Sequence, residues 1–498
     1  MYMKNLKSNL MRVIFIFILT YVAIFLNAQN LIPSTQPNLP QKELMSRGYG
    51  MFIHFGMNTF AELEWSDGSI PVETYCPTNL DCEQWVKVAS EAGFRYVLLI
   101  TKHHDGFCLW DSKYTDYDVM SSPVKRDVVR EVSEACRKYG LQFAIYYSLW
   151  DRHEKSYYSS NFNDYVAYMS NQLSELLTNY GPICEVWFDG GWDKPVEQWQ
   201  LPRLYSLIKK MQPKCAVGVN HTISYPDRLR KLVLPDSMIV DNKYTFQYFP
   251  SDFRLWDPFL PVADDPKIYT HSGKQYYLPF ESTQTISVIG NWFSHPEDTT
   301  VRDVEELADI FYTATINDNC LLLNIPPDTQ GKQNPKAIEN ILTLARQLGI
   351  ENGKPFPKEL KKPQSLITDA TAEATSIYKN DTLHYGPSYA VDNDVSTSWM
   401  SADSLASMTV NLRKESKFQE IFLIIGENSI TQLSIDKEDN GKWVPVYQSG
   451  VIPKQRGESF MGYGTISCKL DEPISAQRLQ IRILQSNGKP SIYSVRLK

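Results

Sequence analysis

The chain has 498 residues, of which 43% are hydrophobic and 21% charged, and its formal net charge is −7. A domain usually takes about 100–200 residues and one α/β barrel about 250, so the length predicts at least two domains. Nucleic-acid binding needs a basic footprint. The acidic balance, without a long basic run in the folded part, argues against a nucleic-acid partner.

The first 28 residues have the pattern of a signal peptide. Three basic residues precede an apolar run at 13–26, and a small-residue cleavage motif ends at Ala28. The alternative is an uncleaved membrane anchor, but the run is short for a span of about 20 residues. We therefore expect a secreted or periplasmic protein with no membrane attachment once residues 1–28 are removed.

Eight cysteines are spread irregularly along the chain. Export permits disulfides. Several cysteines nevertheless lie in apolar segments, and we interpret most of them as buried free thiols. A bridge between Cys76 and Cys82 is the pairing that stays open.

Short apolar runs alternate with amphipathic patterns between residues 45 and 350. The predicted strands are Met51–Phe55, Tyr96–Ile100, Phe143–Tyr147, Glu185–Phe188, Ala216–Val219, Met238–Val240, Tyr276–Phe280 and Cys320–Asn324. The predicted helices are Glu83–Glu91, Val128–Tyr139, Tyr165–Asn179, Gln198–Met211, Val304–Thr315 and Pro335–Leu348. This alternation indicates parallel strands buried on both faces. It predicts a (β/α)₈-like barrel over residues 29–351. An open doubly wound sheet is the alternative, but no G-x-G-x-x-G motif follows a strand.

The pattern changes after a Pro- and Lys-rich stretch at residues 352–364, which we interpret as a linker. Short alternating runs separated by turn residues then fill residues 365–498. They are Met408–Leu412, Ile421–Ile425, Gln432–Ile435, Trp443–Tyr447 and Leu479–Ile483. This pattern predicts a C-terminal β-sandwich.

Polar or ionisable residues stand at nearly every predicted strand end of the barrel. They are His54, His103, His104, Tyr147, Asp189, Asn220, His221, Asp241, Glu281 and Asn324. Barrel enzymes carry their chemistry at the carboxyl ends of the strands. The pattern therefore predicts an active site at that face.

The strongest local signal is the segment Glu185-Val-Trp-Phe-Asp-Gly-Gly-Trp192. An apolar strand ends in Asp189, and two glycines then leave room for a substrate to approach the backbone. A retaining glycosidase needs a carboxylate beneath the anomeric carbon to form a covalent glycosyl intermediate. The alternative is that Asp189 caps the following helix. Trp187 and Trp192 are candidates for a sugar-stacking wall.

Two further segments bring histidines to strand ends. Adjacent His103 and His104 point to opposite sides of a strand. They cannot readily chelate one zinc ion, so hydrogen bonds to sugar hydroxyls fit better than a metal site. His54 ends the first strand, and a Glu64-Trp65 pair follows it. A structural role for some of these histidines is the alternative.

A general acid cannot be chosen from composition alone. The candidates are Asp236, Asp241, Asp252, Asp257, Asp264, Asp265 and Glu281. A serine nucleophile is not supported, because no G-x-S-x-G motif occurs.

Together, YGMFIHFGMNTF, the EW pair, LLITKHHDGFCLWDS, FAIYYSLWD and VWFDGGW resemble family 29 glycoside hydrolases, the retaining α-L-fucosidases. The motifs run in order through residues 45–350. The resemblance implies a (β/α)₈-like barrel followed by a β-sandwich, no metal or cofactor in the chemistry, and a fucosylated oligosaccharide or glycoconjugate as substrate. The FGMNTF…EW form resembles the subgroup that cleaves α-1,3/1,4-linked fucose.

The resemblance also implies roles for individual residues. Asp189 is the expected nucleophile. The expected fucose-binding residues are His54, Glu64, Trp65, His103, His104, Tyr147, Trp187, Arg254 and Trp292. The family's usual catalytic glutamate, in a Gly-Glu-Thr or similar context, is absent. By its spacing from Arg254, Asp265 is the expected acid/base, with Glu281 as the second choice and a solvated turn at residues 264–266 as the alternative.

The C-terminal domain resembles discoidin-like sandwiches of the carbohydrate-binding module 32 kind, through Tyr389-Ala-Val-Asp-Asn-Asp394 and Thr397-Ser-Trp399. Such domains often hold a structural Ca²⁺, here expected at Asp392 and Asp394. A domain that only packs against the barrel is the alternative. Two rival functions also stay open, a sugar-binding barrel without catalysis and a glycosidase for a fucose-like sugar such as L-galactose.

Overall fold

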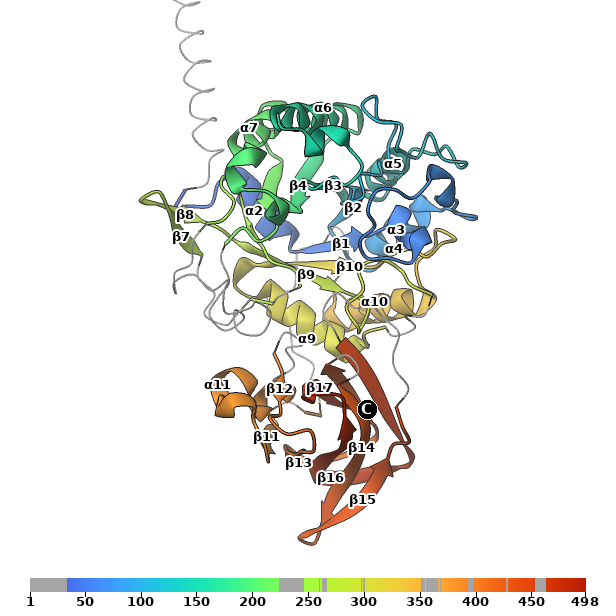
Figure 1. Ribbon diagram of the computed structural model, residues 1–498, viewed down its shortest axis with the longest axis vertical. Coiled ribbons are helices and arrows are strands. Elements are labelled where there is room, and N and C mark those ends of the chain that lie inside the picture. The colour runs from blue at the N-terminus through green and yellow to red at the C-terminus, as the bar shows by residue number, and fades with distance from the viewer. Residues whose placement is uncertain are drawn as a thin grey trace, which may run out of the picture.

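The computed structural model describes residues 34–223, 246–258, 260–261, 267–296, 298, 301–350, 354, 366–367, 369–392, 397–426, 429–452 and 463–498. Within them a barrel of parallel strands is followed by an antiparallel domain (Figure 1). The expected signal peptide and the expected strand Met238–Val240 lie outside the described residues. In the part that is described, no helix is long and apolar enough to cross a bilayer.

The barrel is built from one eight-stranded sheet with the strand order β5-β4-β3-β2-β1-β10-β9-β6. Its strands are β1 (Tyr49–Ile53), β2 (Tyr96–Lys102), β3 (Gln142–Ser148), β4 (Ile183–Asp189), β5 (Ala216–Val219), β6 (Arg254–Leu255), β9 (Phe280–Thr285) and β10 (Cys320–Asn324). The neighbouring strands are parallel. A parallel bridge between Asn220 and Leu255 joins β5 to β6 and closes the ring. The predicted (β/α)₈-like barrel is confirmed.

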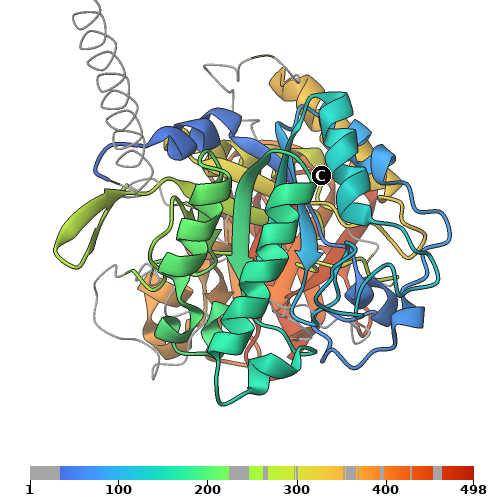
Figure 2. The same cartoon turned by 90° about the horizontal axis from the view of Figure 1, so that it is seen from above.

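Helices surround this sheet, and Figure 2 shows several of them crossing its outer face. They are α2 (Leu39–Arg47), α3 (Met57–Ala61), α4 (Cys82–Glu91), α5 (Val128–Tyr139), α6 (Asn163–Asn179), α7 (Leu201–Met211), α9 (Val304–Thr315) and α10 (Pro335–Leu348). Local sequence fixes several ends. Asp81 and Asp127 accept backbone N–H groups at the starts of α4 and α5, and Gly140 ends α5 with a φ of 71°.

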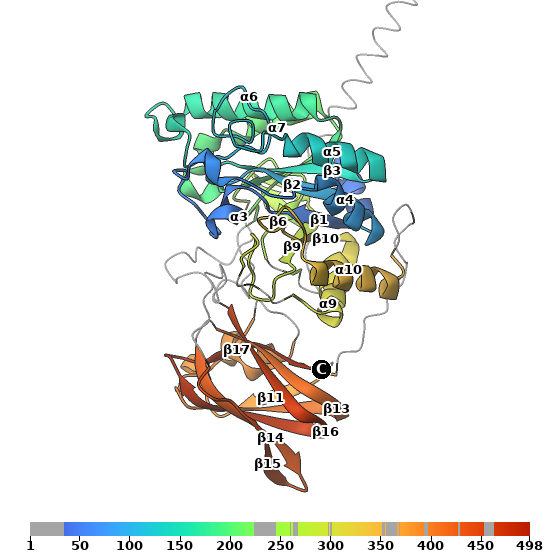
Figure 3. The same ribbon diagram turned by 90° about the vertical axis from the view of Figure 1, so that its right-hand side faces the viewer.

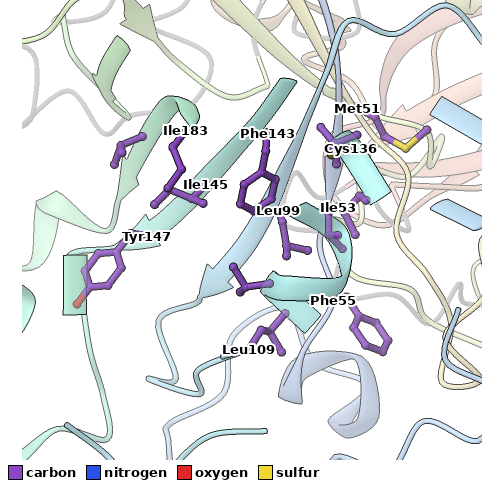
Figure 4. Close-up of a cluster of buried hydrophobic side chains, with 14 of the residues drawn as sticks. Met51, Ile53, Phe55, Leu99, Leu109, Cys136, Phe143, Ile145, Tyr147 and Ile183 are labelled. Carbon is purple, nitrogen blue, oxygen red and sulfur yellow. The ribbon is translucent and has the colours of Figure 1, made fainter. Parts of the chain in front are cut away.

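Alternating side chains divide each barrel strand between two cores. On β3, Phe143, Ile145 and Tyr147 point outward to the helices, together with Ile53 and Leu99 (Figure 4). Ala144 and Tyr146 point into the barrel, in a separate cluster that also holds Phe52, Leu98 and Trp187. This period of two decides which side chains can reach the barrel mouth.

The sixth and seventh barrel strands differ from the prediction. The sixth is the two-residue strand β6 (Arg254–Leu255). The predicted strand Tyr276–Phe280 spans the end of a hairpin, β7 (Ile268–His271) with β8 (Lys274–Tyr277), and the start of β9. Glu281 is therefore the second residue of β9 and lies near the amino end of that strand, opposite the barrel mouth.

The C-terminal domain lies beneath α9, with β17 near the barrel (Figures 1 and 3). Its strands are β11 (Thr371–Ala374), β12 (Trp399–Met400), β13 (Ser407–Gly426), β14 (Ile430–Asp439), β15 (Lys442–Gln448), β16 (Tyr463–Ser486) and β17 (Ser491–Leu497). The short helix α11 (Thr382–Tyr385) precedes β12. The strands pair antiparallel, as expected for a sandwich, and two predicted strands form the single long strand β13. All eight cysteines are free, including Cys76 and Cys82, so the open pairing does not form.

Candidate functional site

The carboxyl ends of the barrel strands open into a cavity of about 490 Å³. Eight of the predicted site residues line it: His54, Glu64, Trp65, His103, His104, Trp187, Asp189 and Trp292. The other lining residues are Phe52, Tyr146, Trp192, Asn220, His221, Gln247, Trp256 and Asp257. The cavity is thus mainly aromatic, with the three carboxylates Glu64, Asp189 and Asp257.

Asp189 is the last residue of β4, and its side chain faces the cavity. Its two oxygens are oriented separately: Asn220 Nδ2 donates to Oδ1 at 3.0 Å, and the Tyr146 hydroxyl donates to Oδ2 at 2.8 Å. Burial raises the pKa of Asp189, and these two donors oppose that shift. The result is a desolvated carboxylate held in one orientation, as a nucleophile requires.

The two glycines after Asp189 serve packing within the protein. Gly190 has a φ of 72°, and a Cβ there would lie 2.7 Å from the Cβ of Trp150. A Cβ on Gly191 would meet the ring of Tyr248 at 2.8 Å. The space left by the missing side chains of these two glycines is therefore filled by Trp150 and Tyr248, which pack around the end of the strand.

Asp257 is the cavity carboxylate next to Asp189, and it follows β6 by two residues. Asn220 Nδ2, which donates to Asp189, also donates to Asp257 Oδ1. One nitrogen joining both groups places their facing oxygens within two hydrogen-bond lengths, roughly 6 Å. Burial, and then the charge of Asp189, raise the pKa of Asp257 to about 7. Asp257 therefore holds a proton at a pH where Asp189, with its two side-chain donors, is ionised.

His54 is a neutral hydrogen-bond acceptor toward the cavity. Burial lowers its pKa to about 3. Asn324 accepts from the backbone N–H of His54 with Oδ1 and donates through Nδ2 to the carbonyl of Trp292 at 2.7 Å, which fixes its orientation. Its Oδ1 must then accept from His54 Nδ1 at 2.8 Å. The proton is on Nδ1, and Nε2 keeps a lone pair.

His103 and His104 are neutral too, but in opposite tautomers. Burial, and then the neighbouring histidines, lower the pKa of both. Asn58 Nδ2, which also donates to the Glu64 carbonyl, lies 3.1 Å from His103 Nδ1, so His103 keeps its proton on Nε2. Ser148 donates to the Trp150 carbonyl and must accept from His104 Nδ1 at 2.7 Å. His103 thus presents an N–H donor at Nε2, and His104 presents a lone-pair acceptor at Nε2.

Aromatic rings complete the wall and the rim. Trp187 is buried and stacks on Tyr146, and among the described residues its Nε1 has no hydrogen-bond partner. Such an N–H in a cavity wall is available to a ligand hydroxyl. At the mouth, Trp65 and Trp192 are 38% and 37% exposed and nearly parallel, with centroids 6.1 Å apart. His221 stacks on Trp256 at 4.1 Å and borders Trp192.

No metal centre is evident in the described residues, where no three His, Cys, Asp or Glu side chains form a group that could hold an ion. Of the two carboxylates expected to bind Ca²⁺, Asp394 lies outside the described residues. Asp392 accepts a hydrogen bond from Thr397 Oγ1 at 2.8 Å.

Comparison with known proteins agrees with the geometry of the site. The family model for α-L-fucosidase matches residues 61–353. The chain belongs to the α-L-fucosidase family. It is 30% identical over 380 residues to α-L-fucosidase 1 of Arabidopsis thaliana, covering 73% of this chain and 68% of the relative. It is 32% identical over 311 residues to a putative α-L-fucosidase 1 of rice, covering 59% of this chain and 55% of the relative.

Solved structures of the α-L-fucosidase family share the fold. A putative α-L-fucosidase from Bacteroides thetaiotaomicron is 26% identical, with a TM-score of 0.51, over 94% of this chain and 98% of that one. The structure of SpGH29 gives a TM-score of 0.52 at 24% identity, over 94% of this chain and 98% of that one. Both matches extend beyond the barrel.

Two residues predicted to bind substrate in this fucosidase-family site lie elsewhere. Tyr147 points outward, and its hydroxyl donates to Gln172 at 2.7 Å (Figure 4). Tyr146 takes the expected place, because adjacent strand residues face opposite sides. Arg254 begins β6 at the amino end of the barrel, over the rings of Tyr269 and Phe280.

The acid/base predictions have separate outcomes. Glu281, near the amino end of β9, accepts from the Tyr96 hydroxyl at 2.5 Å and is not among the cavity residues. Asp265 lies outside the described residues, and its role stays a prediction. Asp257 is among the acid candidates that the sequence offers, but nothing in the sequence selects it. A sixth strand placed at Arg254–Leu255 would have selected Asp257, because Asp257 then follows the carboxyl end of a barrel strand.

Proposed function

We propose that this chain is an exo-acting α-L-fucosidase that hydrolyses terminal α-linked L-fucose with net retention of configuration. Asp189 is the nucleophile, and Asp257 is the general acid/base in place of the predicted Asp265. The single observation that carries the assignment is Asn220, whose side-chain nitrogen donates to both carboxylates inside the cavity. Family membership supplies the substrate class.

The spacing of the two carboxylates favours retention over inversion. Retaining enzymes hold these groups about 5–5.5 Å apart, whereas inverting enzymes need roughly 6.5–9.5 Å to seat a water molecule. Two carboxylates bridged by one nitrogen fit the shorter spacing. Asp189 attacks the anomeric carbon as the bond to the leaving oxygen breaks, and Asp257 gives its proton to that oxygen. Asp257 then takes a proton from water, which attacks the fucosyl ester and releases fucose and the Asp189 carboxylate.

Substrate recognition uses the neutral histidines and the aromatic rim. The lone pairs of His54 and His104 accept from sugar hydroxyls, and the Nε2–H of His103 donates. The exposed rings of Trp65 and Trp192 provide stacking surface for the sugar that carries the fucose. We propose an α-1,3/1,4-linked fucosylated glycan as substrate and, from residues 1–28, a secreted or periplasmic location.

Product stereochemistry in azide tests both carboxylates at once. Asp189→Ala should be rescued to give β-fucosyl azide, because azide replaces the nucleophile and inverts the centre. Asp257→Ala should instead give α-fucosyl azide, because azide intercepts the fucosyl ester formed on Asp189. Glu281→Ala and Asp265→Ala are matched variants and should give fucose alone.

Other outcomes identify the alternatives. An α-azide product from Asp265→Ala would return the acid/base role to that residue. A wild-type chain that binds fucose but turns over no activated aryl fucoside would be a sugar-binding barrel. Faster hydrolysis of an aryl L-galactoside than of the aryl fucoside would show that the enzyme is a glycosidase for the fucose-like sugar L-galactose.

A further inference from the structure

One face of the C-terminal domain is more apolar than a solvent-facing strand allows. On β13, Ile421, Leu423 and Ile425 point into the sandwich core. The alternate residues Phe422 and Ile424 point out of it, yet both are buried. A strand that is apolar on both faces is covered on both sides.

The cover comes from the barrel. Val288 packs with Phe422 and Ile424 in one cluster, and Tyr493 of β17 lies against it. Val288 belongs to residues 286–296, the described stretch that follows β9, which we call the Trp292 segment. The sandwich therefore contacts the barrel through a segment that also forms the cavity.

Ion pairs flank this apolar contact. Arg496 of β17 donates to Glu306 of α9, and Arg302 donates to the same carboxylate. Lys498 Nζ lies 2.7 Å from Asp303 Oδ2. Arg302 in turn donates through Nε to the carbonyl of Thr285 at 2.7 Å and through its backbone N–H to that of Ile286. The charged contact thus reaches the start of the Trp292 segment.

The other end of the segment is part of the sugar pocket. Glu64 accepts from the backbone N–H groups of Trp292 and Phe293 at 3.0 and 3.1 Å and from His295 Nε2 at 2.7 Å. Asn324 donates to the Trp292 carbonyl. These bonds fix the segment from the cavity side only, four residues beyond Val288.

We propose that the C-terminal sandwich is a positioning element for the active site, because it holds the Trp292 segment from behind. Phe422 and Arg496 act through Val288, Arg302 and Glu306, and they touch no substrate. At the start of the segment, the backbone of Ile286 donates to the Asn324 carbonyl and accepts from the Arg302 N–H. Arg302 is in turn joined to the sandwich through Glu306 and Arg496. Removing the sandwich contact should loosen Trp292, the wall against which His54 packs with ring centroids 5.2 Å apart.

The test compares Phe422→Ala and Arg496→Gln with Arg413→Gln in the full chain. Arg413 lies on the same strand as Phe422, but its ion pair with Asp369 is exposed at 73% and 60%. Amide hydrogen exchange at Trp292 and Phe293 is measured first, at a temperature where each variant is folded. Both interface variants should exchange about tenfold faster than wild type, and Arg413→Gln should not.

Kinetics supply the second readout and rest on the proposed function. With an aryl α-L-fucoside, KM and the inhibition constant of free fucose should rise about fivefold in the interface variants, with a smaller change in kcat. If the proposed function is wrong, the wild type will not turn over the fucoside. The result of the amide hydrogen exchange measurement stays valid in that case.

Two results would overturn the positioning role. Variants that denature at lower temperature but keep wild-type exchange and inhibition constants would show that the interface only packs. If activity falls only on glycan substrates and amide hydrogen exchange is unchanged, the sandwich would be a binding module instead. Arg496→Gln preserves side-chain bulk, so it decides the question if Phe422→Ala does not fold.

Discussion

Two pairs of carboxylates occupy opposite ends of the same barrel. Asp189 and Asp257 share Asn220 at the mouth, whereas Glu185 and Glu281 lie near the closed end, where burial, and then the charge of Glu185, raise the pKa of Glu281. Glu185 and Asp189 lie on one strand, four residues or about 13 Å apart. Burial raises the pKa of Asp257 and of Glu185 to about 7 in each case.

The difference lies in the surroundings. Asp189 and Asp257 face a cavity, and their lone pairs can reach a ligand. Glu185 is sealed and paired with Arg47 at 2.9 Å, and Glu281 is held by Tyr96. A raised carboxyl pKa therefore marks both the pair that we propose to be catalytic and a structural pair. Access to a cavity separates them.

The largest expected effect tests which pair contains the acid. Asp257→Ala should lower the rate on a fucosylated glycan about 10³-fold, but much less on an aryl fucoside whose leaving group needs little protonation. Glu281→Gln should stay within about twofold of wild type on both substrates, because it lies in the closed pair. Steady-state kcat/KM on the two substrates provides the check. An equal loss on both substrates for Asp257→Ala would contradict the acid role.

A second comparison concerns neighbouring tyrosines on β3. Tyr146→Phe removes a donor to Asp189 and should lower kcat about 10- to 30-fold. Tyr147→Phe removes a hydroxyl that donates to Gln172 outside the barrel. It should reduce thermal stability and leave kcat unchanged. The reverse pattern would mean that the strand presents its other face to substrate.

The tyrosine pair shows where sequence reasoning stops. Motifs located β3 correctly within a residue or two, but a one-residue difference reverses which side chain faces the cavity. The barrel itself was predictable, because long apolar strands and helices with caps such as Asp127 carry strong local signals. The strand β6 has two residues and no periodicity to detect. Without it, neither Asp257 nor the position of Glu281 could be derived.

The interface face of β13 did carry a signal. The run Ile421-Phe-Leu-Ile-Ile425 is apolar at consecutive positions, whereas a strand with one solvated face alternates. Its partner Val288 is a single valine in an irregular segment. Sequence alone therefore shows that the face is covered, but the fold is needed to show what covers it.

The pH dependence of turnover should distinguish the two pairs more finely. Asp257 must be protonated to act as the acid, and its pKa is raised to about 7. The value of kcat/KM should therefore fall about tenfold per pH unit above that pKa. In Asp257→Ala this alkaline limb should disappear, and in Glu281→Gln it should persist. A limb that survives in Asp257→Ala would belong to another group.

Glu281→Gln should have the smallest effect on turnover. The pH dependence of its stability is the sharpest test of the closed pair. Burial, and then the charge of Glu185, raise the pKa of Glu281 well above its usual value. A carboxyl whose folded pKa is raised keeps its proton while the unfolded chain loses it near pH 4.3. The contribution of Glu281 to the stability of the wild type should therefore be full below about pH 4 and decline as pH rises toward the folded pKa. Glutamine is neutral throughout, and Glu185 is left with Arg47 alone. The variant should consequently gain about 1–3 kcal/mol relative to wild type between pH 5 and pH 8, measured by urea unfolding at each pH. Asp257→Asn is the matched variant at the open end, where the carboxyl lines the cavity and is less fully buried, and its gain should be smaller. A constant difference between Glu281→Gln and wild type across this range would show that the pKa of Glu281 is not raised in the folded protein.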